Sequence, residues 1–410
     1  MKLKLSNFSK NSKLFLAANF FFSFGMNIFF VFFNLYLLKK GINEQQIGSI
    51  ASIAALSGGI GILLVSPYLS SIKHIKSLKI AVICAVSAIF GFTMTADFNN
   101  LMGLAVIYGM TTAFFTTMQV PISMEIVKQS MRKYYFAIST AMFILNGTLA
   151  TLFTGYFPDF MIKYFIFSEG RAYDLVLENI AFSLLISLCI LFFVKEHEKI
   201  DIERVVLLKN IQDLPLKKFF IIGMPTLLVG LGAGLMVPLF NVYFKQKLDF
   251  SLKEISIIFM VSQLLMGLFT LLTPILSKKF RPVTFILLTQ ALSIPFILLI
   301  INTRSIFLVT MAFTLRASLM NMSRPIQSHF EMACFKTKYR AAFAAFKAFF
   351  WNISWAISTL AAGYFQFHKM FDIPLYLSFL LYIVMLLFVF IRFYKKEEDY
   401  LHEIGELSHF

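Results

Sequence analysis

The side chains with the clearest chemistry lie on one apolar stretch, residues 305–335, which contains Arg316, Arg324, Gln327 and Glu331. At 100° per residue of an α-helix, all four fall within about 100° of the circumference. A guanidinium binds a carboxylate or phosphate through two parallel hydrogen bonds. The stripe therefore predicts an anion-binding site at Arg316, Arg324 and Gln327. The alternative is structural pairing of Arg324 and Glu331 with each other or with a neighbouring helix, and Glu331 is also a candidate for coupling or gating.

A second polar face is expected on residues 341–366, where Lys347, Trp351 and Trp355 share one side of a helix. These are the only two tryptophans in the chain, and neither lies where an interfacial anchor would be expected. They are interpreted as substrate-binding walls of a cavity, with ordinary helix packing as the alternative. Lys347 either joins this site or extends to the nearby membrane surface.

Two neutral amides complete the predicted binding residues, Asn27 on the stretch 14–38 and Gln119 on the stretch 101–127. Each belongs to a stripe of uncharged hydrogen-bonding residues, suited either to a polar solute or to bonds between helices. The other members of the stripes are Asn19, Ser23 and Asn34 on the first stretch, and Thr112, Thr116 and Ser123 on the second.

Glu125, near the end of 101–127, is the second candidate for coupling, as a carboxylate that carries a proton. Its helical angle places it off the neighbouring polar stripe, which favours an ion pair with a nearby loop instead. His329 could titrate near neutral pH, although a lone histidine near a helix end more often serves packing.

No metal site or cofactor is expected. Cys84, Cys189 and Cys334 are far apart and show neither metal spacing nor a disulfide pattern. No glycine-rich nucleotide loop followed by Lys and Ser or Thr is present, so ATP is not the direct energy source. The scattered histidines argue against an enzyme embedded in the membrane, which would need catalytic groups gathered at one depth.

These residues must be positioned by a membrane-spanning scaffold. Of 410 residues, 59% are apolar and only 14% are charged, too few charges to cover a water-soluble protein of this size. In lipid only helices or closed barrels satisfy the backbone, and the long unbroken apolar runs favour helices. The predicted spans are 14–38, 46–69, 78–96, 101–127, 135–157, 176–194, 217–244, 254–276, 283–301, 305–335, 341–366 and 374–394.

The formal charge of +16 reports orientation rather than nucleic-acid binding. With both termini cytoplasmic, 25 Lys and Arg residues lie on the cytoplasmic side, 9 lie in the outer loops, and 3 lie inside spans. That excess follows the positive-inside rule and fits contact with anionic lipid headgroups. The first run is too long for a signal-peptide core and is expected to remain as an uncleaved span. These features predict a multi-pass protein of the inner (cytoplasmic) membrane.

The two halves of the sequence repeat each other at an offset of 204 to 208 residues. The matches occur in one order, and both halves begin on the cytoplasmic side, which indicates parallel repeats related by an axis along the membrane normal. We therefore expect a bundle over 1–194, a charged linker over 195–218 and a second bundle with a tail over 219–410. The matched segments are Phe33–Tyr36 with Phe240–Tyr243, Asn43–Gln46 with Ser251–Glu254 (two capping boxes), Pro67–Ser70 with Pro274–Ser277, Pro121–Ile122 with Pro325–Ile326, and Gly155–Phe157 with Gly363–Phe365.

Six plus six helices in parallel halves with a charged linker resemble the major facilitator superfamily over essentially the whole chain. The short basic loops after the second and eighth spans are also similar to that family, but its usual Asp is replaced by Ser71 and Lys278. The resemblance implies an all-α fold of twelve transmembrane helices in two bundles with pseudo-two-fold symmetry. It also implies alternating access around a central cavity lined by the first, fourth, seventh and tenth spans.

The leading hypothesis is thus a monomeric secondary active transporter, not an enzyme, which binds a small-molecule substrate together with a proton or counter-solute. The arginines favour an organic anion or zwitterion. Abundant Phe and Met instead favour export of amphipathic drugs or lipids, and a sensor without transport is a further alternative. Drug exporters of the family commonly carry a Gly-Pro motif in the fifth span, where this chain has Gly147 without the proline.

Overall fold

The protein is known from a computed structural model, which describes residues 8–65, 73–195 and 214–394. Helices account for nearly all of this part, and no strand occurs within these ranges. The first half contains α1 (Lys10–Lys39), α2 (Glu44–Val65), α3 (His74–Met94), α4 (Phe98–Ile126), α5 (Arg132–Phe165) and α6 (Glu169–Phe192). The second contains α7 (Leu216–Met236), α8 (Phe240–Gln246), α9 (Leu252–Leu276), α10 (Pro282–Ser293), α11 (Pro295–Asn302), α12 (Ile306–Met322), α13 (Arg324–Ala333), α14 (Thr337–Phe367) and α15 (Ile373–Val389).

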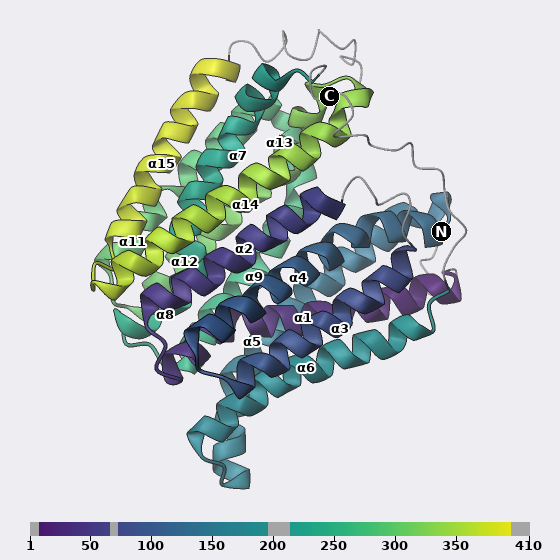
Figure 1. Cartoon of the computed structure of the whole chain (residues 1–410). Helices are drawn as coiled ribbons and strands as arrows, with labels where there is room; N and C mark the ends of the chain where they lie inside the picture. The colour runs from purple at the N-terminus through teal and green to yellow at the C-terminus, as the bar shows by residue number, and fades with distance from the viewer. Residues whose placement is uncertain (1–7, 66–72, 196–213, 395–410) are drawn as a thin grey trace. The chain divides into compact units, whose positions relative to one another are not determined.

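Each of the twelve predicted spans coincides with a helix or a run of helices (Figure 1). Eleven of these, among the described residues, are long and apolar enough to cross a membrane. The remaining span is α14, whose 31 residues reach about 46 Å. Its charged and polar residues keep it outside that apolar group, and one of them, Lys347, pairs with Glu331 of the same unit. Residues 66–69 of the second predicted span, and most of the Pro67–Lys73 loop motif, lie outside the described residues.

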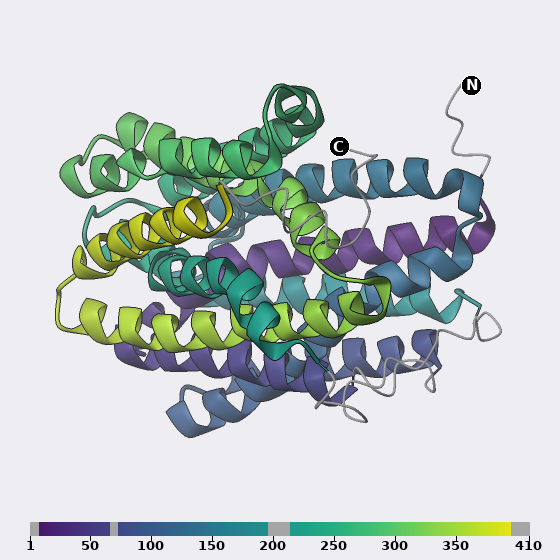
Figure 2. The same cartoon turned by 90° about the horizontal axis from the view of Figure 1, so that it is seen from above.

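The chain divides into two compact units. Unit 1 combines Met1–Arg204 with Asn241–Met260, and unit 2 combines Val205–Phe240 with Val261–Phe410. The predicted boundaries of the two bundles stay a prediction, and residues 196–213 of the predicted linker lie outside the described part. In unit 1, α1 packs on α5 and α6, and α2 packs on α4. In unit 2, α7 packs on α14 and α15, and its close alignment with α14 is visible in both views (Figures 1 and 2).

Both predicted capping boxes are present. At the start of α2, Gln46 N–H donates to Asn43 Oδ1 at 2.9 Å and Asn43 N–H donates to Gln46 Oε1 at 3.3 Å. At the start of α9, Glu254 N–H donates to Ser251 Oγ at 3.3 Å and Ser251 N–H donates to Glu254 Oε2 at 2.7 Å. Each box satisfies two otherwise free backbone groups, so the repeated sequence signal corresponds to repeated local structure.

A second repeated feature is an arginine side chain that caps a helix C-terminus. Arg132 donates from Nη2 and Nε to two carbonyls at the end of α4, at 2.7 and 3.3 Å. Arg340, 208 residues further on, donates from Nε to two carbonyls around the end of α13, at 3.1 and 3.0 Å. The last carbonyls of a helix have no partner within it, and a basic side chain there satisfies them. This pair of arginines lies at an offset of 208 residues, within the range of the other matches of the repeat.

The predicted tenth span is not one continuous helix. It divides at Ser323 into α12 and α13, because Pro325 at the start of α13 has no backbone N–H to donate to the preceding turn. The break is mild, because Ser323 keeps right-handed helical backbone angles, φ −76° and ψ −14°. The two arginines contact different neighbours, one on α15 and one on α14.

Candidate functional site

Arg316, on α12, is a buried cation, with only 4% of its surface exposed. Its Nη2 donates to the Tyr382 hydroxyl at 2.9 Å, and its guanidinium carbon lies 5.8 Å from the centre of that ring. Its Nε has no hydrogen-bond partner, and it forms no ion pair with any carboxylate in the described residues. A buried charge without a counter-charge is costly unless something pairs with it. Arg316 is therefore equipped to receive an anion.

Tyr382 reaches Arg316 because α7 and α15 approach closely at a glycine. A Cβ atom added at Gly232 would meet Cε1 of Tyr382 at 2.4 Å, far inside van der Waals contact. One turn before Tyr382, Ser378 Oγ donates to the Gly232 carbonyl at 2.8 Å. Gly232 is thus required for the close packing of α7 against α15.

Arg324, at the start of α13, is solvent-exposed in the described structure and lies against Trp351 of α14. Its guanidinium carbon is 5.1 Å from the Trp351 ring centre, within range of a cation–π interaction. Trp351 in turn packs on Trp355, with ring centres 5.4 Å apart. Arg324 forms no ion pair with a described carboxylate. The structure thus brings together three predicted residues as a cationic and aromatic group.

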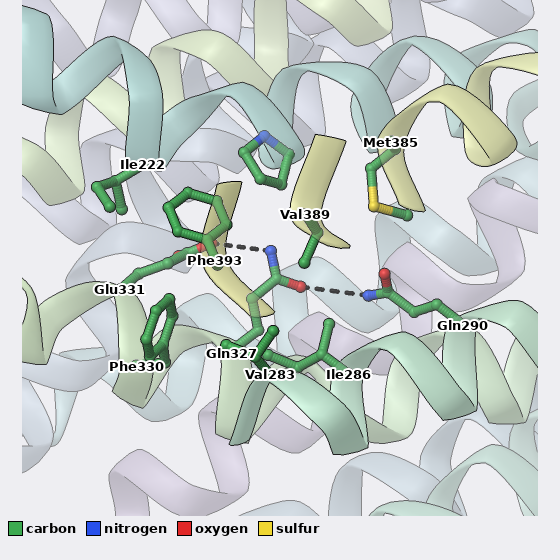
Figure 3. A pocket seen from close by; sticks show the side chains of 11 residues that line it. Ile222, Val283, Ile286, Gln290, Gln327, Phe330, Glu331, Met385, Val389 and Phe393 are labelled. Atoms are coloured by element: carbon green, nitrogen blue, oxygen red, sulfur yellow. Dashed lines mark hydrogen bonds between the residues drawn. The ribbon is translucent and has the colours of Figure 1, made fainter. Parts of the chain in front are cut away.

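The remaining polar residues of α13 form a chain of bonds with α10 and α14. Gln327 donates from Nε2 to Glu331 Oε1 at 2.8 Å and accepts from Gln290 Nε2 at 3.3 Å, as Figure 3 shows. The other oxygen of Glu331 accepts from Lys347 Nζ in a buried ion pair, with the Glu331 side chain 3% exposed. The sequence assigned Lys347 to the substrate and Glu331 to coupling; in this structure they neutralise each other.

The space around this chain is small and mainly apolar (Figure 3). It amounts to about 20 Å³, enough for about one water molecule. Bulky apolar side chains enclose it, including Ile222, Phe330 and Phe393. Glu331 and Gln327 therefore lie in packed protein in this structure, and no solute of organic size fits beside them.

In unit 1 the neutral predicted residues separate. Asn27 donates to the Ser23 carbonyl one turn earlier on α1, at 2.8 Å, a bond within its own helix. Asn34 instead donates to Asn241 Oδ1 at 3.1 Å, and Asn241 donates to the Val31 carbonyl at 2.8 Å. Of the predicted neutral pair, Gln119 lines a cavity of about 220 Å³ between α1, α4 and α5.

Glu125, at the end of α4, pairs with His74 at the start of α3. Its Oε1 lies 2.6 Å from His74 Nδ1, and both side chains are only about one-tenth exposed, 11% and 10%. This matches the alternative in which Glu125 forms an ion pair with a nearby loop end. His329, on α13, is exposed.

Several residues at these sites were missed from the sequence. Tyr382 and Gln290 contact predicted residues, and Asn146 and Ser139 line the cavity with Gln119. Each is a polar group within a predicted span, which is the signal that could have found them. Among the described residues no cluster of His, Cys, Asp and Glu could hold a metal ion.

Comparison with known proteins gives a family and a fold. Residues 15–359 match the family described as the Major Facilitator Superfamily. No curated protein matches. One similar solved structure is a bacterial homologue of the human lysosomal transporter Spinster, inward-facing and unoccupied, with TM-score 0.73 and 14% identity over 98% of this chain and 100% of that one.

Two further solved structures have the same fold. An auto-inhibited peptide transporter of the POT family has TM-score 0.74 and 8% identity, over 98% of each chain. A D-xylose–proton symporter has TM-score 0.69 and 14% identity, covering 92% of this chain and 96% of that one. At these identities the likeness concerns the fold alone.

Proposed function

Because the chain belongs to the major facilitator superfamily over residues 15–359, we propose that it is a secondary active transporter of a small organic anion or zwitterion, working by alternating access. Members of the family are transporters of solutes rather than enzymes. The observation that carries the choice of solute is Arg316, a buried guanidinium with an unpartnered Nε and no described carboxylate beside it.

In this proposal Arg316 binds a carboxylate or phosphate of the solute. Tyr382 holds the guanidinium from one side through Nη2, which leaves Nε free to donate to an incoming oxygen. An N–H donor with a formal charge makes a stronger bond than a neutral donor. The binding energy comes from giving the buried charge the partner that the protein does not provide.

Arg324 and Trp351 offer a second point of attachment. The guanidinium already lies over the Trp351 ring, and stacking on one face leaves its in-plane N–H groups available to an acceptor. Trp355 extends the aromatic surface. An anion with an apolar body would satisfy both the cationic and the aromatic part of this group.

We assign coupling to the buried Glu331–Lys347 pair. Protonation of Glu331 would remove its charge and release Lys347, which would then be a buried cation without a partner. Such a change destabilises one arrangement of the helices relative to another, which is what coupling to a proton requires. Glu125, the other residue that we propose for coupling, pairs with His74 at the opposite end of α4 from Asp97.

We also propose that the protein lies in the inner membrane with both termini in the cytoplasm. The excess of Lys and Arg on one set of loops favours cytoplasmic termini and the inner membrane. We expect a monomer that works in contact with anionic lipids.

The test is uptake into proteoliposomes across a panel of carboxylates, phosphates, zwitterions and amphipathic dyes. Arg316→Ala should lower anion uptake about 10- to 100-fold, because it removes charge-assisted hydrogen bonds. The matched control is Arg304→Ala, which removes the same charge from an exposed loop residue. Unchanged anion uptake by Arg316→Ala would overturn the proposal, and uptake of dyes without anions would replace it with amphipathic export.

A further inference from the structure

The cavity of unit 1 lies between α1, α4 and α5 and measures about 220 Å³. A single water molecule needs only about 15 Å³ by the same measure, so the cavity admits a small organic group. It is smaller than the roughly 300–1,000 Å³ of pockets for drug-sized ligands. Its walls are formed by Leu16, Asn19, Phe20, Ser23, Gln119, Ser139, Thr140, Met142, Phe143 and Asn146.

Four of its polar side chains have no hydrogen-bond partner among the described residues: Asn19, Ser23, Gln119 and Ser139. Asn19 is 8% exposed, and its Oδ1 is fully enclosed without a partner. Asn146 is completely buried; its Nδ2 donates to the Phe20 carbonyl while its Oδ1 is also unpartnered. By contrast, Thr140 bonds within its own helix.

Unpaired polar groups in a protein interior need a partner. Each buried group left without a hydrogen bond costs about 1–3 kcal/mol, and most such groups in proteins are satisfied by protein or by water. Asn19 is buried, whereas Ser23, Gln119 and Ser139 are half-buried around the same opening, and together they offer both donors and acceptors. An occupant that pairs with all of them carries both as well.

The absence of charge on the lining residues limits which chemical groups of a ligand could bind there. None of the lining residues carries a charge. An ammonium group would find no carboxylate there, and a carboxylate would find no cation. An apolar substituent would leave the amides unsatisfied. Hydroxyl groups, each one donor and one acceptor, fit this set.

We propose that this cavity is a binding subsite for a polyhydroxylated group, such as a polyol or sugar-like part of the transported solute. The proposal rests on the proposed transport function and adds the substrate class. Asn19 and Gln119 are its central residues, because each is an amide with no described partner. Asn146 is a positioning residue, since its Nδ2 is committed to the carbonyl of Phe20 on α1.

The test is equilibrium binding of radiolabelled sorbitol to the purified full-length protein, with 1-hexanol as a six-carbon competitor that has one hydroxyl. Unlabelled sorbitol should displace the label, and 1-hexanol should not. Asn19→Leu, of similar volume, should weaken sorbitol binding about tenfold, whereas Asn19→Thr, which keeps a neutral donor and acceptor, should bind within about threefold of wild type. Asn179→Leu on α6, a part-buried asparagine outside the cavity, is the matched control.

Absence of sorbitol binding to the wild type would overturn the proposal, as would equal displacement by 1-hexanol. Unchanged binding by Asn19→Leu would overturn it as well. Should Asn19→Leu fail to fold, the same loss is expected in Gln119→Leu, whose side chain lies on another helix. These results are separate from the anion test: Arg316→Ala tests anion transport, and sorbitol binding tests the cavity, so either can fail while the other holds.

Discussion

The two units use matching positions of the sequence repeat for different chemistry. In α5 and α14, which correspond at an offset of 208, Ser139 and Phe143 of unit 1 match Lys347 and Trp351 of unit 2. Ser139 and Phe143 line an uncharged cavity of about 220 Å³. Lys347 instead binds Glu331, and Trp351 supports Arg324. The two helices therefore match in the sequence repeat but carry side chains of different chemistry at the matching positions.

The divergence has a physical pattern. Where unit 1 has short side chains it leaves space and unpaired neutral groups. Where unit 2 has long ones, they fill the space and pair with each other, leaving only about 20 Å³ beside Glu331. Charged side chains inside a membrane protein are tolerated only when they are paired or when they bind a ligand. Lys347 and Glu331 are paired with each other, and we propose that Arg316 serves a ligand.

The largest effect is expected from separating the paired charges. Glu331→Gln leaves Lys347 as a buried cation without its partner and should cost about 3–5 kcal/mol of stability. Equilibrium unfolding in detergent would measure it. The double variant Glu331→Gln with Lys347→Met should recover most of the loss. In unit 1, Ser139→Ala should change stability by less than about 0.5 kcal/mol, and a comparable loss there would remove the contrast between the units.

A smaller effect is expected at the close approach of α7 and α15. Gly232→Ala places a methyl group against the Tyr382 ring and should cost about 1–3 kcal/mol through overpacking. Because Tyr382 positions Arg316, anion binding should also weaken. Gly170→Ala, where an added Cβ meets nothing within 4 Å, is the control. If both variants unfold at the same temperature and bind anions equally, Tyr382 does not position Arg316 in this way.

Much of the frame followed from sequence. Apolar length predicted the spans, and the two capping boxes formed as expected because their bonds are local, three residues apart. The division of the stretch 305–335 was not expected, although Pro325 is its physical cause: it separates α12 from α13 at Ser323.

The partners of the candidate residues could not be predicted in the same way. Glu331 and Lys347 are 16 residues apart on different helices, and Arg316 and Tyr382 are 66 apart. No local spacing joins such residues; only the packing of α12, α13, α14 and α15 does. Likewise, Asn19 and Asn27 belong to one predicted stripe, yet Asn19 lines the cavity beside α5 while Asn27 bonds within its own helix.

The central claim is that Arg316 gives unit 2 its preference for anions, and matched carboxylate and carboxamide ligands test it most directly. Each carboxylate is compared with the carboxamide of the same carbon skeleton, so that the two ligands differ in charge. The ligands have chains of two to six carbons. The wild type should bind at least one carboxylate about tenfold or more tightly than its amide. In Arg316→Gln that Kd ratio should fall to about one. A ratio unchanged by Arg316→Gln, or no preference in the wild type, would contradict the account.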